Sequence, residues 1–276
     1  MKIGVSSYSF AHYQRDTHAS YLKLCDLARE IGFDGIEFID LDPEYQPAAD
    51  LCALADEIRA HCEAIGLPII AYTVGADFIE TPDMVAQLKA KIDVAEHLGA
   101  KVVRHDVTWR RDLDWREIIA RTKDSVREVT EYAARKGIRT CTENHGYVMQ
   151  DANRVEELIL AVNHPNYGWL VDMGNFLCAD EPSMHALPIA AKYAFHAHAK
   201  DFLLKSEKPS DEWFPTRNGN FLRGTVVGHG VVPVRECVKT LREAGYDGWL
   251  SLEFEGMEDN LPALRAGLSY LRSVTE

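Results

Sequence analysis

The chain has 276 residues, of which 46% are hydrophobic, and a formal net charge of −13. A chain of this length and composition can bury a large core, and it suits either one α/β barrel or two smaller domains. The negative charge opposes unspecific binding to nucleic acid or anionic lipid, because such binding needs Lys and Arg to neutralise phosphates. We therefore expect a small-molecule partner, no nucleic acid and no membrane.

The cysteines and the first residues indicate the compartment. The six cysteines are scattered, form no CxxC pair and lie partly inside apolar runs, which is typical of reduced core residues. The segment MKIGVSSYSF lacks the apolar core of a secretion signal, and no stretch reaches the roughly 18 apolar residues of a membrane helix. We expect a soluble, cytoplasmic protein.

Strand-like apolar runs alternate with amphipathic helical patterns along the chain. Runs that are apolar on both faces and separated by helices are typical of a parallel sheet covered by helices. The expected strands are residues 3–8, 34–39, 68–74, 101–107, 138–144, 167–172, 193–200 and 248–255, and the expected helices are 21–32, 50–66, 84–99, 115–137, 154–163, 183–192, 234–245 and 260–273.

Eight strand–helix units without a linker favour a closed barrel over an open doubly wound sheet. The open sheet has no sequence support as a dinucleotide-binding fold, because no GxGxxG follows the first strand. The pattern predicts a single (β/α)8 TIM barrel formed by residues 1–276.

Four of the expected strands end in residues that can bind a metal. They are the strands with TENHG, LVDMGN, HAHAKD and SLEFEG, which contribute Glu143, Asp172, His198 and Glu253. Strand ends meet at the C-terminal mouth of a barrel, where active sites lie. A single acid at a strand end is usually a helix cap or a solvated residue. Together, however, three carboxylates and an imidazole stay unfavourably desolvated without a cation, so the cluster predicts a metal site.

The ordered segments TENHG, VDMGN, HAHAKD, GHGVVP and SLEFEG resemble the xylose isomerase-like barrels of the sugar phosphate isomerase/epimerase family. This resemblance implies that Glu143, Asp172, His198 and Glu253 bind one divalent cation and that the two glutamates also flank the substrate. These donors suit Mn²⁺, Mg²⁺ or Co²⁺, and Zn²⁺ is also compatible.

The chain departs from that family at two places. Ketose 3-epimerases of the family carry a His three residues after the metal-binding Asp, where this chain has Asn175, and the HAKDF segment replaces their HxGExxR-like pattern. The HxKD form is similar to that of inosose dehydratases, which makes β-elimination an alternative. The related apurinic endonucleases need three zinc ions and a basic surface, which this sequence does not offer.

These residues predict a sugar or polyol isomerase or epimerase that acts through a metal-stabilised enediolate. Glu143 and Glu253 would be the acid/base pair, and Lys200 would assist catalysis or bind a substrate oxygen. A dehydratase or other lyase shares the same enediolate, and a non-catalytic carbohydrate-binding barrel is the third hypothesis.

Further residues are expected around the substrate, although a structural role is open for each. Residues 202–227 form a long segment after the seventh strand and are expected to be a lid or a subunit contact. By resemblance we expect a homo-oligomer, either a dimer or a tetramer. The expected substrate contacts are Glu37, His105, Trp109, Asn175 and Arg223.

Overall fold

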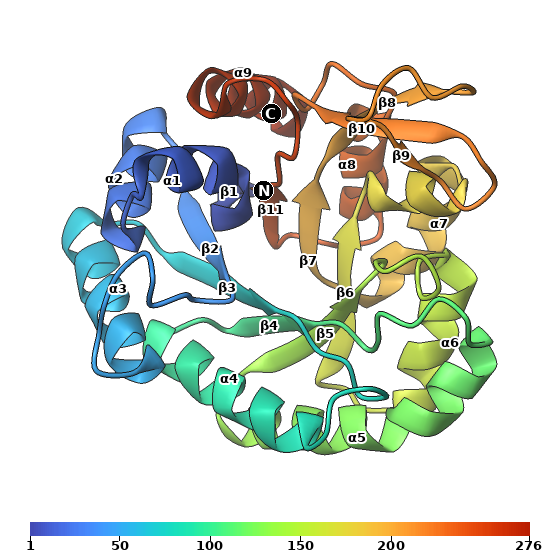
Figure 1. Cartoon of the computed structure of the whole chain (residues 1–276), viewed down its shortest axis with the longest axis horizontal. Coiled ribbons are helices and arrows are strands. Elements are labelled where there is room, and N and C mark those ends of the chain that lie inside the picture. Colours follow the sequence, from blue (N-terminus) through green and yellow to red (C-terminus); the bar gives the residue numbers. More distant parts are fainter.

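The computed structural model describes residues 1–276 and forms a closed barrel of eight strands surrounded by helices (Figure 1). Neighbouring strands are parallel, and the last barrel strand, β11, closes the ring against β1. The predicted (β/α)8 TIM barrel is confirmed. The barrel strands are β1 (Lys2–Ser6), β2 (Gly35–Ile39), β3 (Ile69–Val74), β4 (Val102–His105), β5 (Arg139–Glu143), β6 (Tyr167–Asp172), β7 (Ala194–Ala199) and β11 (Trp249–Leu252).

The helices form the outer layer, and the short α1 lies before the first full helix (Figure 1). Three 3₁₀ segments, Ser7–Phe10, Asn175–Ala179 and Ala191–Tyr193, follow or precede barrel strands. The helices are α1 (Ala11–Thr17), α2 (Tyr21–Ile31), α3 (Leu51–Ile65), α4 (Met84–Leu98), α5 (Trp115–Arg135), α6 (Ala152–Val162), α7 (Ser183–Ala190), α8 (Val234–Glu243) and α9 (Asn260–Thr275).

Local sequence signals explain where the first helices begin and end. The side chains of Ser20 and Asp50 accept backbone N–H groups in the first turns of α2 and α3. Gly32 and Gly66 end these helices with φ values of 107° and 66°, a left-handed conformation in which glycine has no steric penalty.

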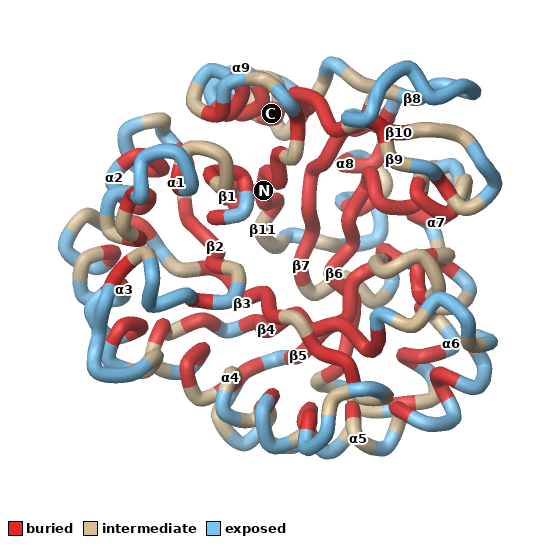
Figure 2. Tube along the Cα trace, in the orientation of Figure 1, coloured by how far each residue is buried: buried red, intermediate tan, exposed pale blue.

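The core has one large cluster and two small ones, of which the smaller contains Cys178, Phe202 and Leu222. A cluster of 68 buried residues fills the space between the strands and the helices. A separate small cluster, Ala71, Val102, Cys141 and Leu170, comes from four adjacent strands. Figure 2 shows the barrel strands buried along most of their length. Because side chains alternate along a strand, Cys141 lies on the same face of β5 as Glu143, and the small cluster therefore forms an apolar layer below the polar strand ends.

Residues 201–225 differ from the expected loop. They form a small antiparallel sheet of β8 (Asp201–Lys205), β9 (Phe214–Pro215) and β10 (Phe221–Thr225), with β10 in the middle. This sheet stands apart from the barrel strands at the orange part of Figure 1. Whether it moves as a lid or contacts another subunit stays a prediction.

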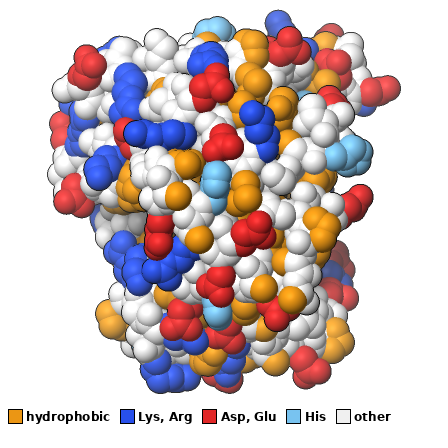
Figure 3. Space-filling model, turned by 90° about the vertical axis from the view of Figure 1, so that its left-hand side faces the viewer, with side chains coloured by type: hydrophobic (Ala, Val, Ile, Leu, Met, Phe, Trp, Pro, Cys, Tyr) orange, Lys and Arg blue, Asp and Glu red, His pale blue; other side chains and the backbone are white.

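The surface carries both signs of charge. On the face shown in Figure 3, acidic and basic side chains are interspersed over the helices.

None of the helices combines the length and the apolar character needed to cross a membrane.

Asp201 connects the end of β7 to the loop before α8. Its carboxylate is 1% exposed and accepts the backbone N–H groups of Gly228, Gly230 and Val232 at 2.8–3.0 Å. A Cβ at position 230 would lie 2.1 Å from Asp201 Oδ1, so the close approach requires glycine there. This explains the GHG sequence without any catalytic role.

We expect Asp201→Asn to lower the free energy of unfolding by about 2–4 kcal/mol, because the amide nitrogen cannot accept and leaves buried N–H groups unpaired. Urea denaturation measures this change. Asp211→Asn, the same substitution at an exposed position of the same segment, should change stability by less than about 0.5 kcal/mol. Equal stability of Asp201→Asn and the unmodified protein would contradict this role.

Candidate active site

The four expected metal-binding side chains meet at the C-terminal end of the barrel. Glu143 and Asp172 end β5 and β6, His198 lies near the end of β7, and Glu253 follows β11. All four residues are buried, and one donor atom of each lies within 4.8 Å of the others. His198 Nδ1 is 3.7 Å from Glu143 Oε1, 3.9 Å from Asp172 Oδ2 and 3.6 Å from Glu253 Oε2.

Two of these side chains are held so that one atom points into the cluster. Asp172 Oδ1 accepts the N–H groups of Gly174 and Asn175, both at 2.7 Å. On His198, Nε2 lies 2.7 Å from Glu37 Oε1. The remaining atoms, Asp172 Oδ2 and His198 Nδ1, are buried and have no hydrogen-bond partner, and the close contact of His198 Nε2 with Glu37 does not have hydrogen-bond geometry.

The crowding of negative charge has a clear electrostatic consequence. Burial, together with the carboxylates of Glu143 and Glu253, raises the pKa of Asp172 to about 7 even though Lys200 opposes the shift. A bound cation would stabilise the ionised form of this carboxyl, because its positive charge offsets the two neighbouring carboxylates.

The residues fit one divalent cation. Three carboxylate oxygens and one imidazole nitrogen are hard to borderline donors. Ligands about 2.1 Å from a common ion are roughly 3–4 Å apart, which matches the observed separations around His198. The carboxylate of Glu37 behind the ring is the arrangement that orients metal-binding histidines.

A second set of charges surrounds Glu143. Arg104 of β4 places Nη2 2.7 Å from Glu143 Oε2 and also binds both oxygens of Asp106, at 2.8 and 3.0 Å. Asp106 in turn lies 2.9 Å from His145 Nδ1. Burial opposes protonation of His145, but Asp106 outweighs it and raises the pKa of that imidazole. Asn175 Nδ2 donates to Glu143 Oε1 at 2.9 Å, so both oxygens of this glutamate are oriented.

Lys200 is the corresponding partner of Glu253. Its ammonium lies 2.5 Å from Glu253 Oε2 and 2.9 Å from Glu255 Oε2. These contacts hold Lys200 between two acids, and Lys200 also lines the cavity described next.

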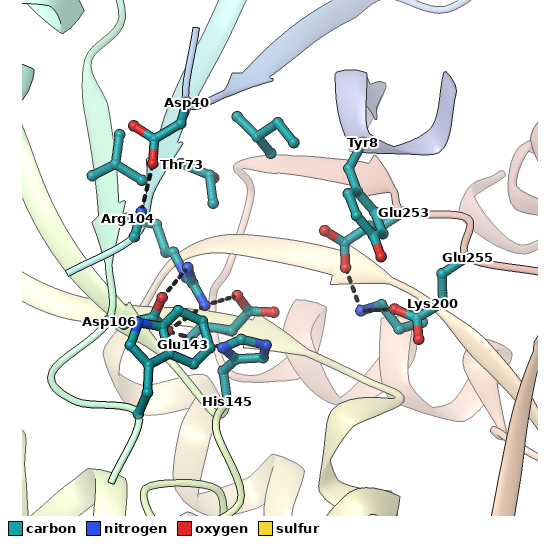
Figure 4. A pocket seen from close by; sticks show the side chains of 14 residues that line it. Tyr8, Asp40, Thr73, Arg104, Asp106, Glu143, His145, Lys200, Glu253 and Glu255 are labelled. Carbon is teal, nitrogen blue, oxygen red and sulfur yellow. Dashed lines mark hydrogen bonds and ion pairs between the residues drawn. The ribbon is translucent and has the colours of Figure 1, made fainter. Parts of the chain in front are cut away.

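A cavity of about 280 Å³ opens above this cluster. This volume is near the lower end of ordinary small-molecule sites. Tyr8 and Trp109 line the cavity together with the charged residues. Figure 4 shows two groups of charged side chains facing each other across it: Arg104, Asp106, Glu143 and His145 on one side, and Lys200, Glu253 and Glu255 on the other.

Of the five expected substrate contacts, only Trp109 and Asn175 line a cavity. Glu37 is fully buried below the site, with its carboxylate on His196 and His198. The Glu37 carboxylate therefore faces the two histidines rather than the cavity in this structure, and a contact between Glu37 and substrate stays a prediction.

His105 and Arg223 also lie away from the cavity, and their contacts with substrate stay predictions. The His105 ring stacks on Tyr167 at 5.9 Å between the barrel and the helices, and burial lowers its pKa to about 4. Arg223 lies on β10 and pairs with Glu212 at 3.2 Å. Neither residue lines the cavity.

Arg104 and Asp106 are the functional residues that sequence reasoning missed. In the segment KVVRHDV, the predicted substrate contact was His105. Its side chain lies on the face of β4 that packs on Tyr167, whereas Arg104 lines the cavity. The available signal was the pair Arg104 and Asp106, opposite charges two residues apart and therefore on one face of an expected strand. Val102 precedes Arg104 and Asp106 on that face, and it is the apolar residue of the three.

Comparison with known proteins identifies the family. A family model described as a xylose isomerase-like TIM barrel matches residues 25–274. The chain belongs to this family. A fructoselysine 3-epimerase from Shigella flexneri is 26% identical over 258 residues, covering 87% of each chain. An inosose dehydratase from Yersinia enterocolitica is 28% identical over 165 residues, which is 56% of this chain and 52% of the relative, so the match spans about half of that protein.

Solved structures of other proteins show the same fold. The IOLI protein, solved with a bound zinc atom, has a TM-score of 0.77 at 20% identity and covers 99% of this chain and 98% of its own. A xylose isomerase-like TIM-barrel protein from Mycobacterium smegmatis in complex with magnesium has a TM-score of 0.75 at 18% identity, covering 99% and 96%. The named relatives include both epimerases and dehydratases, the two reaction types considered from the sequence.

The pKa of Asp172 leads to a prediction for the protein stripped of metal with EDTA. Because the folded-state pKa of about 7 lies above the ordinary 3.8, the folded protein loses stability as pH rises from about 4 to 7, and the loss persists above pH 7. Asp172→Asn removes this penalty. We expect the variant to be more stable than the unmodified protein at pH 8, by a difference about 2 kcal/mol larger than at pH 5.

Urea denaturation at the two pH values measures this difference, and Asp211→Asn is the exposed control. A variant that is less stable than the unmodified protein at pH 8 would show that the charges are already compensated without a cation.

Proposed function

We propose that this protein is a divalent-metal-dependent epimerase or isomerase that acts on a sugar or polyol. One observation carries the proposal: two buried glutamates from β5 and β11 face a single cavity from opposite sides, and both belong to a four-donor cluster that fits a cation. The ligands would be Glu143, Asp172, His198 and Glu253.

The charges around the two glutamates favour their ionised forms. Burial by itself raises the pKa of Glu143, but the charges of Arg104 and His198 outweigh it and hold that pKa below its ordinary value. Burial likewise opposes ionisation of Glu253, and Lys200 and His198 lower its pKa well below the ordinary range. Both side chains are therefore available as bases.

A divalent cation in this cluster would polarise a substrate carbonyl and stabilise the negative charge that develops when the neighbouring C–H loses its proton. Glu143, oriented by Arg104 and Asn175, removes that proton from one face of the carbon. Glu253 passes a proton from the Lys200 ammonium, 2.5 Å away, to the opposite face, and exchange with solvent then removes the proton from Glu143 and restores that of Lys200. Transfer to the opposite face of one carbon inverts it, and transfer between neighbouring carbons interconverts an aldose and a ketose.

We expect Glu143→Gln and Glu253→Gln each to reduce turnover by about 100-fold or more, because an amide is not a base. The measurement is incorporation of solvent deuterium from D₂O into a panel of ketoses and inososes by Mn²⁺-loaded protein, followed by NMR. Glu212→Gln makes the same chemical change on the surface and should leave the rate unaffected. Unchanged exchange in either active-site variant would remove that residue from the acid/base pair.

A dehydratase is the second candidate function. The Lys200 ammonium, 2.5 Å from Glu253 Oε2, can donate a proton to a departing hydroxyl. An inosose dehydratase is among the relatives that match part of this chain. In this case the same proton abstraction is followed by loss of water rather than by reprotonation of carbon.

Product mass separates the two functions. An epimerase or isomerase gives a product of unchanged mass apart from deuterium, whereas a dehydratase gives a product lighter by one water. If elimination is the reaction, Lys200→Met should slow water loss by about 100-fold while exchange of the C–H proton continues. Metal-dependent turnover of any substrate would exclude a non-catalytic carbohydrate-binding barrel. The identity of the cation, the homo-oligomeric state and the cytoplasmic location stay predictions.

A further inference from the structure

A second cavity adjoins the one that holds the acid cluster. It has a volume of about 230 Å³, and it shares the side chains of Trp109, His145, Lys200 and Glu255 with the first cavity. The two spaces therefore meet at these four residues, and a molecule held in the first can extend into the second. We call the second space the side cavity.

The walls of the side cavity are largely aromatic. Phe202 of β8 and Phe214 of β9 pack edge to face with ring centres 5.8 Å apart, and Tyr147 and Trp109 contribute two further rings. Cys178 also lines the space, and burial raises the pKa of its thiol to about 12, so it stays neutral. These surfaces offer dispersion contacts and ring stacking rather than hydrogen bonds.

Two polar side chains of the side cavity, Gln150 and Glu255, already have partners, whereas Arg111 makes only its contact with the Tyr147 ring. Gln150 accepts the N–H of Tyr147 at 2.7 Å and donates to the carbonyl of Asn175 at 2.6 Å. Glu255 is paired with Lys200 at 2.9 Å. A sugar hydroxyl placed beside Gln150 or Glu255 would lose water without gaining a free partner, which costs free energy. The first cavity differs, because it opens above the cluster in which Asp172 Oδ2 and His198 Nδ1 lack partners.

Tyr147 is held in an unfavourable backbone conformation. Its φ is 69°, in the left-handed region that a bulky side chain rarely adopts. Its hydroxyl donates to the carbonyl of Pro215 at 2.8 Å, the Arg217 guanidinium donates to its carbonyl, and the Arg111 guanidinium lies 4.0 Å over its ring. Strain that the surroundings maintain in this way is typical of binding sites.

We propose that the side cavity binds an apolar, ring-containing group attached to the sugar, so that the substrate is a glycoside or a similar sugar conjugate rather than a free sugar. The proposal rests on the proposed function only in placing the sugar in the first cavity. The β8–β10 sheet then sets substrate specificity by supplying Phe202 and Phe214 as the outer walls.

Binding calorimetry on the full-length, Mn²⁺-loaded protein tests this with two probes, phenyl β-D-glucopyranoside and methyl β-D-glucopyranoside. These differ only in the group attached to the sugar. We expect the phenyl compound to bind about tenfold more tightly or better, as burial of an aromatic ring among others implies. Phe214→Ala should reduce the ratio of the two dissociation constants toward one, and Phe214→Trp, which fills the cavity, should do the same.

Leu204→Ala is the matched control, because Leu204 is 40% exposed on β8 and does not line the side cavity. It should preserve the ratio, and circular dichroism verifies that each variant is folded. Equal affinities for the two probes, no binding of either, or a ratio that survives both Phe214 variants would overturn the proposal.

This result is independent of the test of catalysis. A phenyl preference that depends on Phe214 without any deuterium exchange on any substrate would uphold the side cavity and reject the proposed function. Deuterium exchange into free ketoses combined with equal affinities for the two probes would uphold the proposed function and reject the side cavity as a binding site.

Discussion

Three carboxylates and an imidazole share a space in which one atom of each lies within 4.8 Å of the others, at the buried end of a parallel barrel. Like charges at this spacing and burial repel strongly unless opposite charge is close by. Much of the surrounding structure supplies that opposite charge or orients its partners. Arg104 faces Glu143, Lys200 faces Glu253, and Asp172 has no dedicated cation of its own within 3 Å, which leaves it with a raised pKa.

The barrel can sustain this crowding because its backbone is rigid. Asn144 connects neighbouring strands, since its amide donates to the carbonyl of Asp172 and its oxygen accepts the N–H groups of Asp172 and Trp169. Glu37 lies on β2, which β1 and β11 separate from β7 around the ring, and it reaches across the interior to His198. Asn144 and Glu37 line neither cavity, so the contacts that they make with Asp172 and His198 preserve geometry when charge or ligands change.

The segments after the strands add a second feature to the barrel. The barrel provides the acid cluster, whereas the β8–β10 sheet and the 145–150 turn provide the aromatic side cavity. This division explains how relatives named as epimerases and as dehydratases can share one scaffold, because loops vary while strand ends keep their positions.

The sequence by itself determined the barrel and the four converging donors. Eight apolar runs separated by helical patterns specify a parallel sheet, and in such a sheet all carboxyl ends meet at one edge, so the polar residue at each end can be placed without coordinates. Only the tertiary structure decided which of two consecutive polar residues in a strand points into the barrel and which points toward the helices. In β4, Arg104 faces Glu143 and His105 faces the helices, because the apolar layer that includes Val102 fixes the alternation. The destination of Glu37 and the aromatic side cavity likewise depend on contacts between residues more than 50 positions apart, which no local pattern encodes.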